Sequence, residues 1–218
     1  KKAKKIEKIC FEEMLELSSL GAKVLQIRSV EFASKYEMPI RVLSSFNSTG
    51  GTLITKEESS LESAVISGIT CTNDDSKLIL RNVPDTPGIA AKILSPISDA
   101  GIDIDVIVQN VGSDKLTDFT FTVKNDHSDE AAKILSNLVK NLGGGEIELV
   151  NDISKVSVVG VGMKSHAGVA AQMFKALADK QINIDMISTS EIKISVVVSK
   201  DKAEAAVKAL HDEFELDK

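Results

Sequence analysis

The stretch SKLILRNVPDTPGIAAKIL at residues 76–94 is matched further along the chain by SKVSVVGVGMKSHAGVAAQMF at residues 154–174. Both begin with Ser-Lys and an apolar segment, pass through a loop, and reach the same Gly-x-Ala-Ala motif at Gly88 and Gly168. The offset is 78 residues at the first segment and 80 at the motif, so the second copy has a slightly longer loop. Such self-similarity indicates an internal duplication, and it predicts two copies of one small folding unit.

The correspondence extends through the rest of each copy. Residues 99–105 (DAGIDID) match residues 179–185 (DKQINID), and residues 118–123 match residues 191–196. Apolar residues recur at helical spacing after each glycine motif, whereas they alternate in the later segments as in a half-buried strand. A second helix closes each copy, with these residues inward: Ala132, Leu135 and Val139, or Val207, Leu210 and Phe214.

The two copies differ in their last strand. Residues 146–150 supply one to the first copy, but the second copy reaches Lys218 without room for one. The segment VISGIT at residues 65–70 reads as a strand without a partner of its own. We therefore predict an α+β fold of two ferredoxin-like βαββαβ units, in which the first (73–151) is inserted in the second (65–72 and 152–218).

Residues 1–60 differ from the duplicated region. Helical spacing predicts a helix over 1–20 with Gly21 as its C-cap, and a short helix over 30–36 that ends before Pro39. A strand over 40–46, a loop over 47–51 and a charged linker over 56–62 complete this region. Because so few elements cannot bury a full core, we interpret residues 1–60 as the end of another domain. The start without Met, within a helical pattern, suggests a fragment of a longer protein.

Composition excludes several classes of function. The chain of 218 residues has a net charge of −6 and only 4% aromatic residues, which disfavours nucleic-acid binding. No apolar run is long enough to predict a membrane span. Two cysteines, Cys10 and Cys71, form neither a disulfide framework nor a metal motif, and without a visible signal peptide we expect a cytoplasmic protein.

The loop before the first glycine motif has the character of a binding site. Free N–H groups at a helix start favour an anion such as an α-carboxylate, and Asp85 supplies a negative group suited to an α-ammonium. A site with both the partly positive helix start and the negative Asp85 suits an amino acid, which carries a carboxylate and an ammonium group. The alternative, which the loop alone favours, is a capped turn in which Asp85 is an ordinary helix cap.

Equivalent polar residues end a strand in each copy. Gln109-Asn110 in the first copy and Thr189-Ser190-Glu191 in the second could face a ligand or a neighbouring unit, or could simply protect a sheet edge. His166, in the second glycine loop, has no serine-protease-like partners, so we predict no catalytic residue. The paired polar residues Asp103 with Asp105, and Asn183 with Asp185, lack converging ligands, so we predict no metal site.

The residues quoted above carry a family resemblance. The two units resemble ACT domains, small βαββαβ regulatory modules that bind amino acids. Nearly the whole chain resembles the aspartate kinase family. VPDTPGIAAKIL (83–94) with IDIDVIVQN (102–110) resembles its first ACT unit, and 156–174 with INIDMISTSEIKISVVV (182–198) its second. Residues 11–46 resemble the end of the family's kinase domain.

The resemblance implies feedback regulation. Threonine, lysine or both would bind where the first unit of one chain meets the second unit of another in a homodimer. Carried over by motif, the effector-binding residues would be Asp85, Gly88, Ile89, Ala90, Gln109 and Asn110 on one side, and Val169, Ala170, Asn183, Ile184, Ser188, Thr189, Ser190 and Glu191 on the other.

The resemblance also sets an expectation about catalysis. The family's N-terminal nucleotide motif does not occur in this sequence, so we expect the chain alone to be inactive and to contain no cofactor. ATP and Mg²⁺ would belong to the intact enzyme, and a separate catalytic subunit is a further expected partner. The alternatives are an ACT scaffold that only dimerises the enzyme, and a nucleic-acid-binding βαββαβ module, which the charge disfavours.

Overall fold

The computed structural model describes residues 4–57, 65–112, 115–142 and 145–218. The chain divides into two compact units. One, called the inserted unit here, is Asn73–Ile153, and the other, the outer unit, combines Lys1–Thr72 with Ser154–Lys218.

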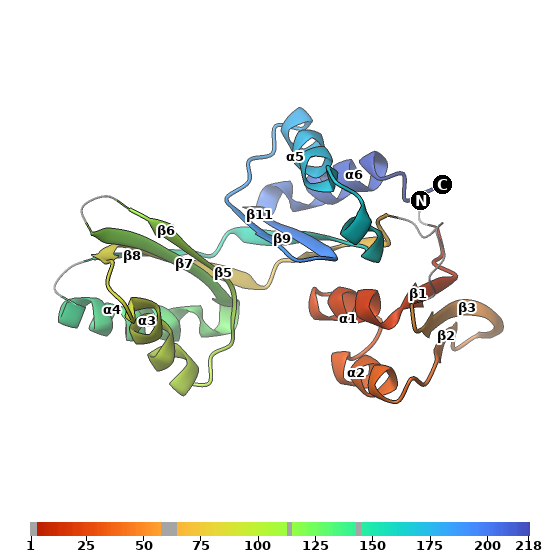
Figure 1. Cartoon of the computed structure of the whole chain (residues 1–218), viewed down its shortest axis with the longest axis horizontal. Helices are drawn as coiled ribbons and strands as arrows, with labels where there is room; N and C mark the ends of the chain where they lie inside the picture. The colour runs from red at the N-terminus through yellow and green to blue at the C-terminus, as the bar shows by residue number, and fades with distance from the viewer. Residues whose placement is uncertain (1–3, 58–64, 113–114, 143–144) are drawn as a thin grey trace. The chain divides into compact units, whose positions relative to one another are not determined.

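The inserted unit has the predicted βαββαβ order. Its elements are β5 (Asp75–Pro84), α3 (Ile89–Asp99), β6 (Ile104–Val111), β7 (Leu116–Lys124), α4 (Ser128–Leu142) and β8 (Glu146–Val150). The antiparallel sheet has the order β6-β7-β5-β8, and both helices lie on one face of it (Figure 1). Phe119, Phe121 and Val123 alternate inward from β7 and are buried against Ile93 and Leu135 of the helices.

The outer unit contains a module of the same kind. Its elements are β4 (Gly68–Thr72), β9 (Ile153–Val159), α5 (Val169–Asp179), β10 (Met186–Thr189), β11 (Lys193–Ser199) and α6 (Ala203–Glu213). The sheet order β10-β11-β9-β4 repeats that of the inserted unit. Met173 and Leu177 of α5 and Leu210 of α6 are buried against the sheet.

The position of β4 confirms the predicted insertion. This strand precedes the inserted unit in the chain, yet it pairs antiparallel with β9, which follows that unit, from Gly68 opposite Val159 to Thr72 opposite Lys155. The strand begins later than the predicted 65–70, although the Ser67 N–H already donates to the Val159 carbonyl at 2.8 Å.

The N-terminal segment forms a small sheet with two helices. Its elements are β1 (Lys8–Cys10), α1 (Phe11–Ser19), α2 (Ile27–Lys35), β2 (Ile40–Ser44) and β3 (Asn47–Thr55), with the sheet order β1-β3-β2. Met14 and Leu17 of α1 are buried with Val30 of α2, and Val159 of β9 belongs to the same core cluster. The segment therefore shares buried surface with the start of the loop that follows β9.

Two sequence predictions for this segment are wrong. The helix predicted over 1–20 begins only at Phe11, because residues 8–10 pair with β3 and the Cys10 side chain caps the helix. The loop predicted over 47–51 is the first half of β3, because Asn47 stands opposite Ser44 of β2 and Thr52 stands opposite Val42. Gly50 and Gly51, with left-handed φ angles of 81° and 80°, lie beside the register shift between these two pairs. Residues 58–62 of the predicted linker lie outside the described residues.

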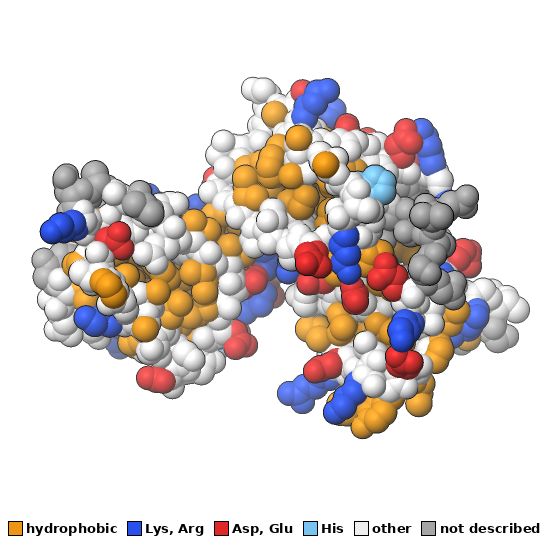
Figure 2. Space-filling view, in the orientation of Figure 1, with side chains coloured by type: hydrophobic (Ala, Val, Ile, Leu, Met, Phe, Trp, Pro, Cys, Tyr) orange, Lys and Arg blue, Asp and Glu red, His pale blue; other side chains and the backbone are white. Residues whose placement is uncertain are grey.

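The predicted cap after α1 is confirmed. Gly21 has a φ of 102°, and the Ala22 N–H donates to the Leu17 carbonyl at 2.9 Å, which is the hydrogen bond of a Schellman motif. Hydrophobic side chains are exposed over α2 (Figure 2), among them Phe32 and Tyr36, whose rings stack at 6.5 Å.

Candidate functional site

The first turn of α3 has backbone N–H groups that no described side chain caps. Gly88 precedes the helix with a φ of 90°, a left-handed conformation that favours glycine. A Cβ built on Gly88 would meet no described atom within 4 Å, so the approach to this turn is open. The Ile89 N–H donates a hydrogen bond to the Thr86 carbonyl at 3.1 Å. The other N–H groups of this turn are left to receive an anion.

Strand register brings the predicted residues of the inserted unit to the same end of its sheet. Val83 at the end of β5 and Val111 at the end of β6 both stand opposite Thr117 of β7. The exposed side chains of Asp85, Gln109 and Asn110 therefore lie at the end where α3 begins. The Asp85 N–H is held by the Lys115 carbonyl at 2.7 Å, which fixes the loop and leaves the carboxyl group in solvent.

The outer unit repeats this arrangement at α5. Gly168 has a φ of 97°, no described side chain caps the helix start, and a Cβ there would again meet open space among the described atoms. The longer loop of this copy, residues 160–168, contains a 3₁₀ turn over Val161–Ser165. His166 donates from Nδ1 to the Gly162 carbonyl at 2.8 Å, so its imidazole is a structural support of the loop.

The polar residues that end β10 lie beside this loop. Thr189 stands opposite Ile194 of β11, the Ser190 N–H donates to the Lys193 carbonyl, and the Gly160 N–H donates to the Ile192 carbonyl at 3.0 Å. Ser188, Thr189, Ser190 and Glu191 are therefore at the end of the sheet where the loop to Val169 and Ala170 begins.

Asn183 and Ile184 occupy a different place. They precede β10, whose first residue, Met186, stands opposite Val197 at the far end of β11. The outer unit thus does not bring these two predicted residues to the end that contains Ser190. The Asn183 amide instead donates to the Asp185 carboxylate at 3.3 Å. Residues 101–110 and 181–190 nevertheless show the same order of buried, half-buried and exposed side chains, position by position, so the duplication extends to packing.

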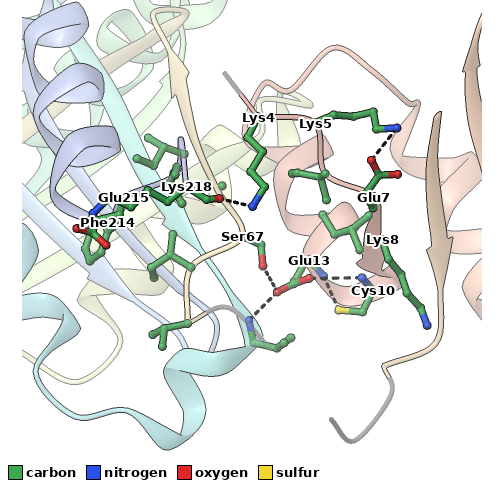
Figure 3. A pocket seen from close by; sticks show the side chains of 18 of the residues that line it. Lys4, Lys5, Glu7, Lys8, Cys10, Glu13, Ser67, Phe214, Glu215 and Lys218 are labelled. Carbon is green, nitrogen blue, oxygen red and sulfur yellow. Dashed lines mark hydrogen bonds and ion pairs between the residues drawn. The ribbon is translucent and has the colours of Figure 1, made fainter. Parts of the chain in front are cut away.

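A cavity of about 810 Å³ lies elsewhere in the outer unit (Figure 3). Its walls come from residues 4–10, from the approach to β4 and from the end of α6, and of the loop 160–168 only Val161 lines it. None of the predicted effector residues lines this cavity. Its size is that of a ligand pocket, but the paired charges and open helix start that suit an amino acid are found at the loops described above.

Sequence reasoning missed Glu13, a buried side chain that lines the cavity. Its carboxyl group accepts hydrogen bonds from the Ser67 hydroxyl and from the Val161 N–H at 2.9 Å. A usable signal was present, since Cys-x-x-Glu before an apolar helix is a capping box with Cys10 in the place of serine. Desolvation raises the pKa of the Cys10 thiol to about 12.

The described ranges contain no group of three or more His, Cys, Asp or Glu residues that could hold a metal ion. Within the same ranges no helix is long and apolar enough to cross a membrane.

Two family models match the chain at the two βαββαβ modules. Both are ACT domain models, one over residues 78–141 and the other over residues 156–214, so the class of protein is defined by a pair of ACT domains. A regulatory subunit of aspartate kinase from Thermus thermophilus is 41% identical, and the match covers 99% of that chain and 69% of this one with a TM-score of 0.66. The chain belongs to the aspartate kinase family.

Full-length relatives extend the similarity to the N-terminal segment. An aspartate kinase from Pseudomonas fluorescens is 59% identical over 216 residues, which are 99% of this chain and 52% of that protein. The aspartate kinase structure from Clostridium acetobutylicum is 27% identical with a TM-score of 0.86, over 97% of this chain and 49% of that one. The chain spans about half the length of the curated relatives it matches.

Proposed function

We propose that this chain is the amino-acid-sensing region of an aspartate kinase. Threonine, lysine or both would bind between the inserted unit of one chain and the ACT module of the outer unit of another. The proposal rests on two open helix starts, α3 and α5, at which no described side chain caps the helix. Each follows a left-handed glycine, Gly88 or Gly168, and each lies in a module with polar residues at the same end of its sheet.

The chemistry of the site follows from these groups. At the 88–90 helix start the Ile89 N–H already donates to the Thr86 carbonyl, so the N–H groups of Gly88 and Ala90 would hold the effector's α-carboxylate, because a helix start carries partial positive charge. The exposed Asp85 carboxylate would hold the α-ammonium. Gln109 and Ser190 would contact the effector's side chain and so discriminate between amino acids.

Effector binding is tested by isothermal titration of the chain with threonine, with lysine and with both. Asp85→Ala and Ser190→Ala are each expected to weaken effector binding. Asp85→Ala should raise the dissociation constant about 10-fold or more, because a hydrogen bond to a charged group contributes roughly 1.5–3 kcal/mol. Asp212→Ala on α6 and Ser136→Ala on α4 are the controls, since both side chains are exposed and lie outside the proposed site. Unchanged affinity in Asp85→Ala and Ser190→Ala would contradict the site assignment.

Two exposed edge strands favour a second function, the assembly of two copies of the chain into a homodimer. β6 and β10 are sheet edges in their modules, and each exposes an isoleucine at an equivalent position, Ile107 at 48% and Ile187 at 45%. Unpaired edges with apolar side chains suit contact with a second chain. We expect a homodimer in light scattering, with a hydrodynamic change on adding the effector. A dimer that does not respond to either amino acid would favour a scaffold without effector binding.

The remaining assignments concern the complete enzyme. We assign residues 1–60 to the end of a kinase domain, which the match of the full-length relatives over this segment and the exposed apolar side chains of α2 support. ATP and Mg²⁺ would bind to the remainder of a cytoplasmic aspartate kinase, as part of this polypeptide or as a separate catalytic subunit. The chain alone is expected to be inactive.

A further inference from the structure

Glu13 joins three separate segments of the outer unit. It is the third residue of α1 and is only 5% exposed. Its carboxyl group accepts from the Ser67 hydroxyl just before β4, from the Val161 N–H after β9, and from the Cys10 N–H at 3.4 Å (Figure 3). A buried carboxyl group needs such donors to offset its desolvation, so its contacts hold all three segments in place.

Further contacts join α1 to the same region. Cys10 is buried in one apolar cluster with Val161 and Ile192, which precedes β11. Glu16 pairs with Lys193 at 3.0 Å, and both side chains are about three-quarters buried, at 26% and 23% exposed. Glu12 pairs with Lys164 at 3.1 Å in a more exposed contact. The buried contacts of Glu13 and Glu16 thus hold the start of the loop 160–168 and the start of β11, whereas the exposed Glu12 pair contributes little.

We propose that Glu13 is a positioning residue for effector binding, which fixes the start of the loop 160–168 and so couples the effector site to α1. This inference rests on the proposed function. Val161, which Glu13 holds, and Gly168, which precedes Val169 and Ala170 on the outer unit's side of the proposed effector site, lie at the two ends of one short loop. A loop already held in its binding geometry loses less freedom when the ligand binds.

Coupling of this kind is reciprocal. If the Glu13 contacts favour the conformation that binds the effector, a bound effector must strengthen those contacts by the same factor. The effector should therefore reduce the opening of α1 away from the loop, and loss of Glu13 should weaken effector affinity. If the carboxyl group of Glu13 were purely structural, its loss would lower stability but leave effector affinity unchanged, and the effector would not reduce the opening of α1.

Cys10 provides a local probe of this opening. Its Sγ accepts the Glu13 N–H at 3.4 Å, and the side chain is buried, only 8% exposed, in the wall of the cavity. Reaction with a thiol reagent therefore requires local opening that exposes the sulfur, and burial also raises the pKa of the thiol. Mass spectrometry after labelling with iodoacetamide separates Cys10 from Cys71, the only other cysteine.

The experiment compares the full chain with Glu13→Gln and with Glu12→Gln as the matched control. In Glu13→Gln we expect effector affinity to fall about 5-fold or more, as in typical couplings, and Cys10 labelling to quicken by a similar factor. Saturating threonine or lysine should slow Cys10 labelling in the wild type. Glu12→Gln should change neither quantity by more than about 2-fold, because an exposed ion pair contributes little.

Ser67→Ala is a second variant, which retains the carboxyl group and removes one donor; a smaller change in the same direction is expected. Effector affinity within about 2-fold of wild type in both Glu13→Gln and Ser67→Ala would overturn the inference. If the wild type binds neither amino acid, the proposed function fails and the coupling with it. In that case the labelling rates alone decide whether Glu13 holds the loop.

Discussion

Gly160→Ala is expected to lower the free energy of unfolding of the outer unit by about 3 kcal/mol, the upper end of the usual cost of overpacking. Gly160 has a φ of 178°, an extended conformation that alanine adopts freely, so the cost comes from packing. A Cβ at this position would lie 2.2 Å from the Val65 carbonyl oxygen and 2.8 Å from the Ile66 Cα, both backbone atoms that cannot rotate away. The change should also displace the loop that leads to Gly168.

Gly168→Ala is the matched control for Gly160→Ala. Its φ of 97° makes alanine strained, but the surrounding space is open among the described atoms, so the cost should be about 1 kcal/mol. Urea unfolding followed by circular dichroism measures both variants. A Gly160→Ala variant no less stable than Gly168→Ala would show that the close approach of the Val65 backbone is not a constraint.

Phe121→Ala is expected to destabilise the inserted unit by roughly 4 kcal/mol, within the range for deleting a buried phenylalanine side chain. The Phe121 ring is fully buried in the core of that unit and packs edge-to-face on Phe119 at 6.2 Å. Since the outer unit has a separate core, amide hydrogen exchange should accelerate mainly between Asn73 and Ile153.

Phe46→Ala is the control for the loss of a phenylalanine ring. Phe46 is 100% exposed, so its removal should change stability by less than about 0.5 kcal/mol. If Phe121→Ala were equally mild, or if exchange accelerated uniformly over both units, the assignment of two independent cores would be contradicted.

The fold of the duplicated region could be predicted because its signals are local and occur twice. Apolar periodicity defined the elements, and the missing fourth strand of the second copy, beside an unpartnered VISGIT segment, defined the insertion. The N-terminal segment was harder, since tertiary pairing decides its elements. Residues 8–10 continue a helical pattern but pair with β3, and the glycines of 47–51 are typical of a loop but lie in a strand.

The candidate site could be predicted in part. Asp85, Gln109 and Asn110 are brought together by strand register, which the sequence indicates once the element order is known. Glu13 could not be found in this way, because its partners Ser67 and Val161 are 54 and 148 residues away in sequence. The separation of Asn183 from Ser190 follows from their places at opposite ends of β10, which a motif match does not encode.

A crystal structure of the chain with bound threonine or lysine would locate the effector site. We predict the effector's α-carboxylate at the first turn of α3, within hydrogen-bond distance of the N–H groups of Gly88 and Ala90, and its ammonium at Asp85. The second side of the site would come from another copy of the chain. An effector found instead in the cavity beside Glu13, with the first turn of α3 left empty at saturating concentration, would contradict the proposed site.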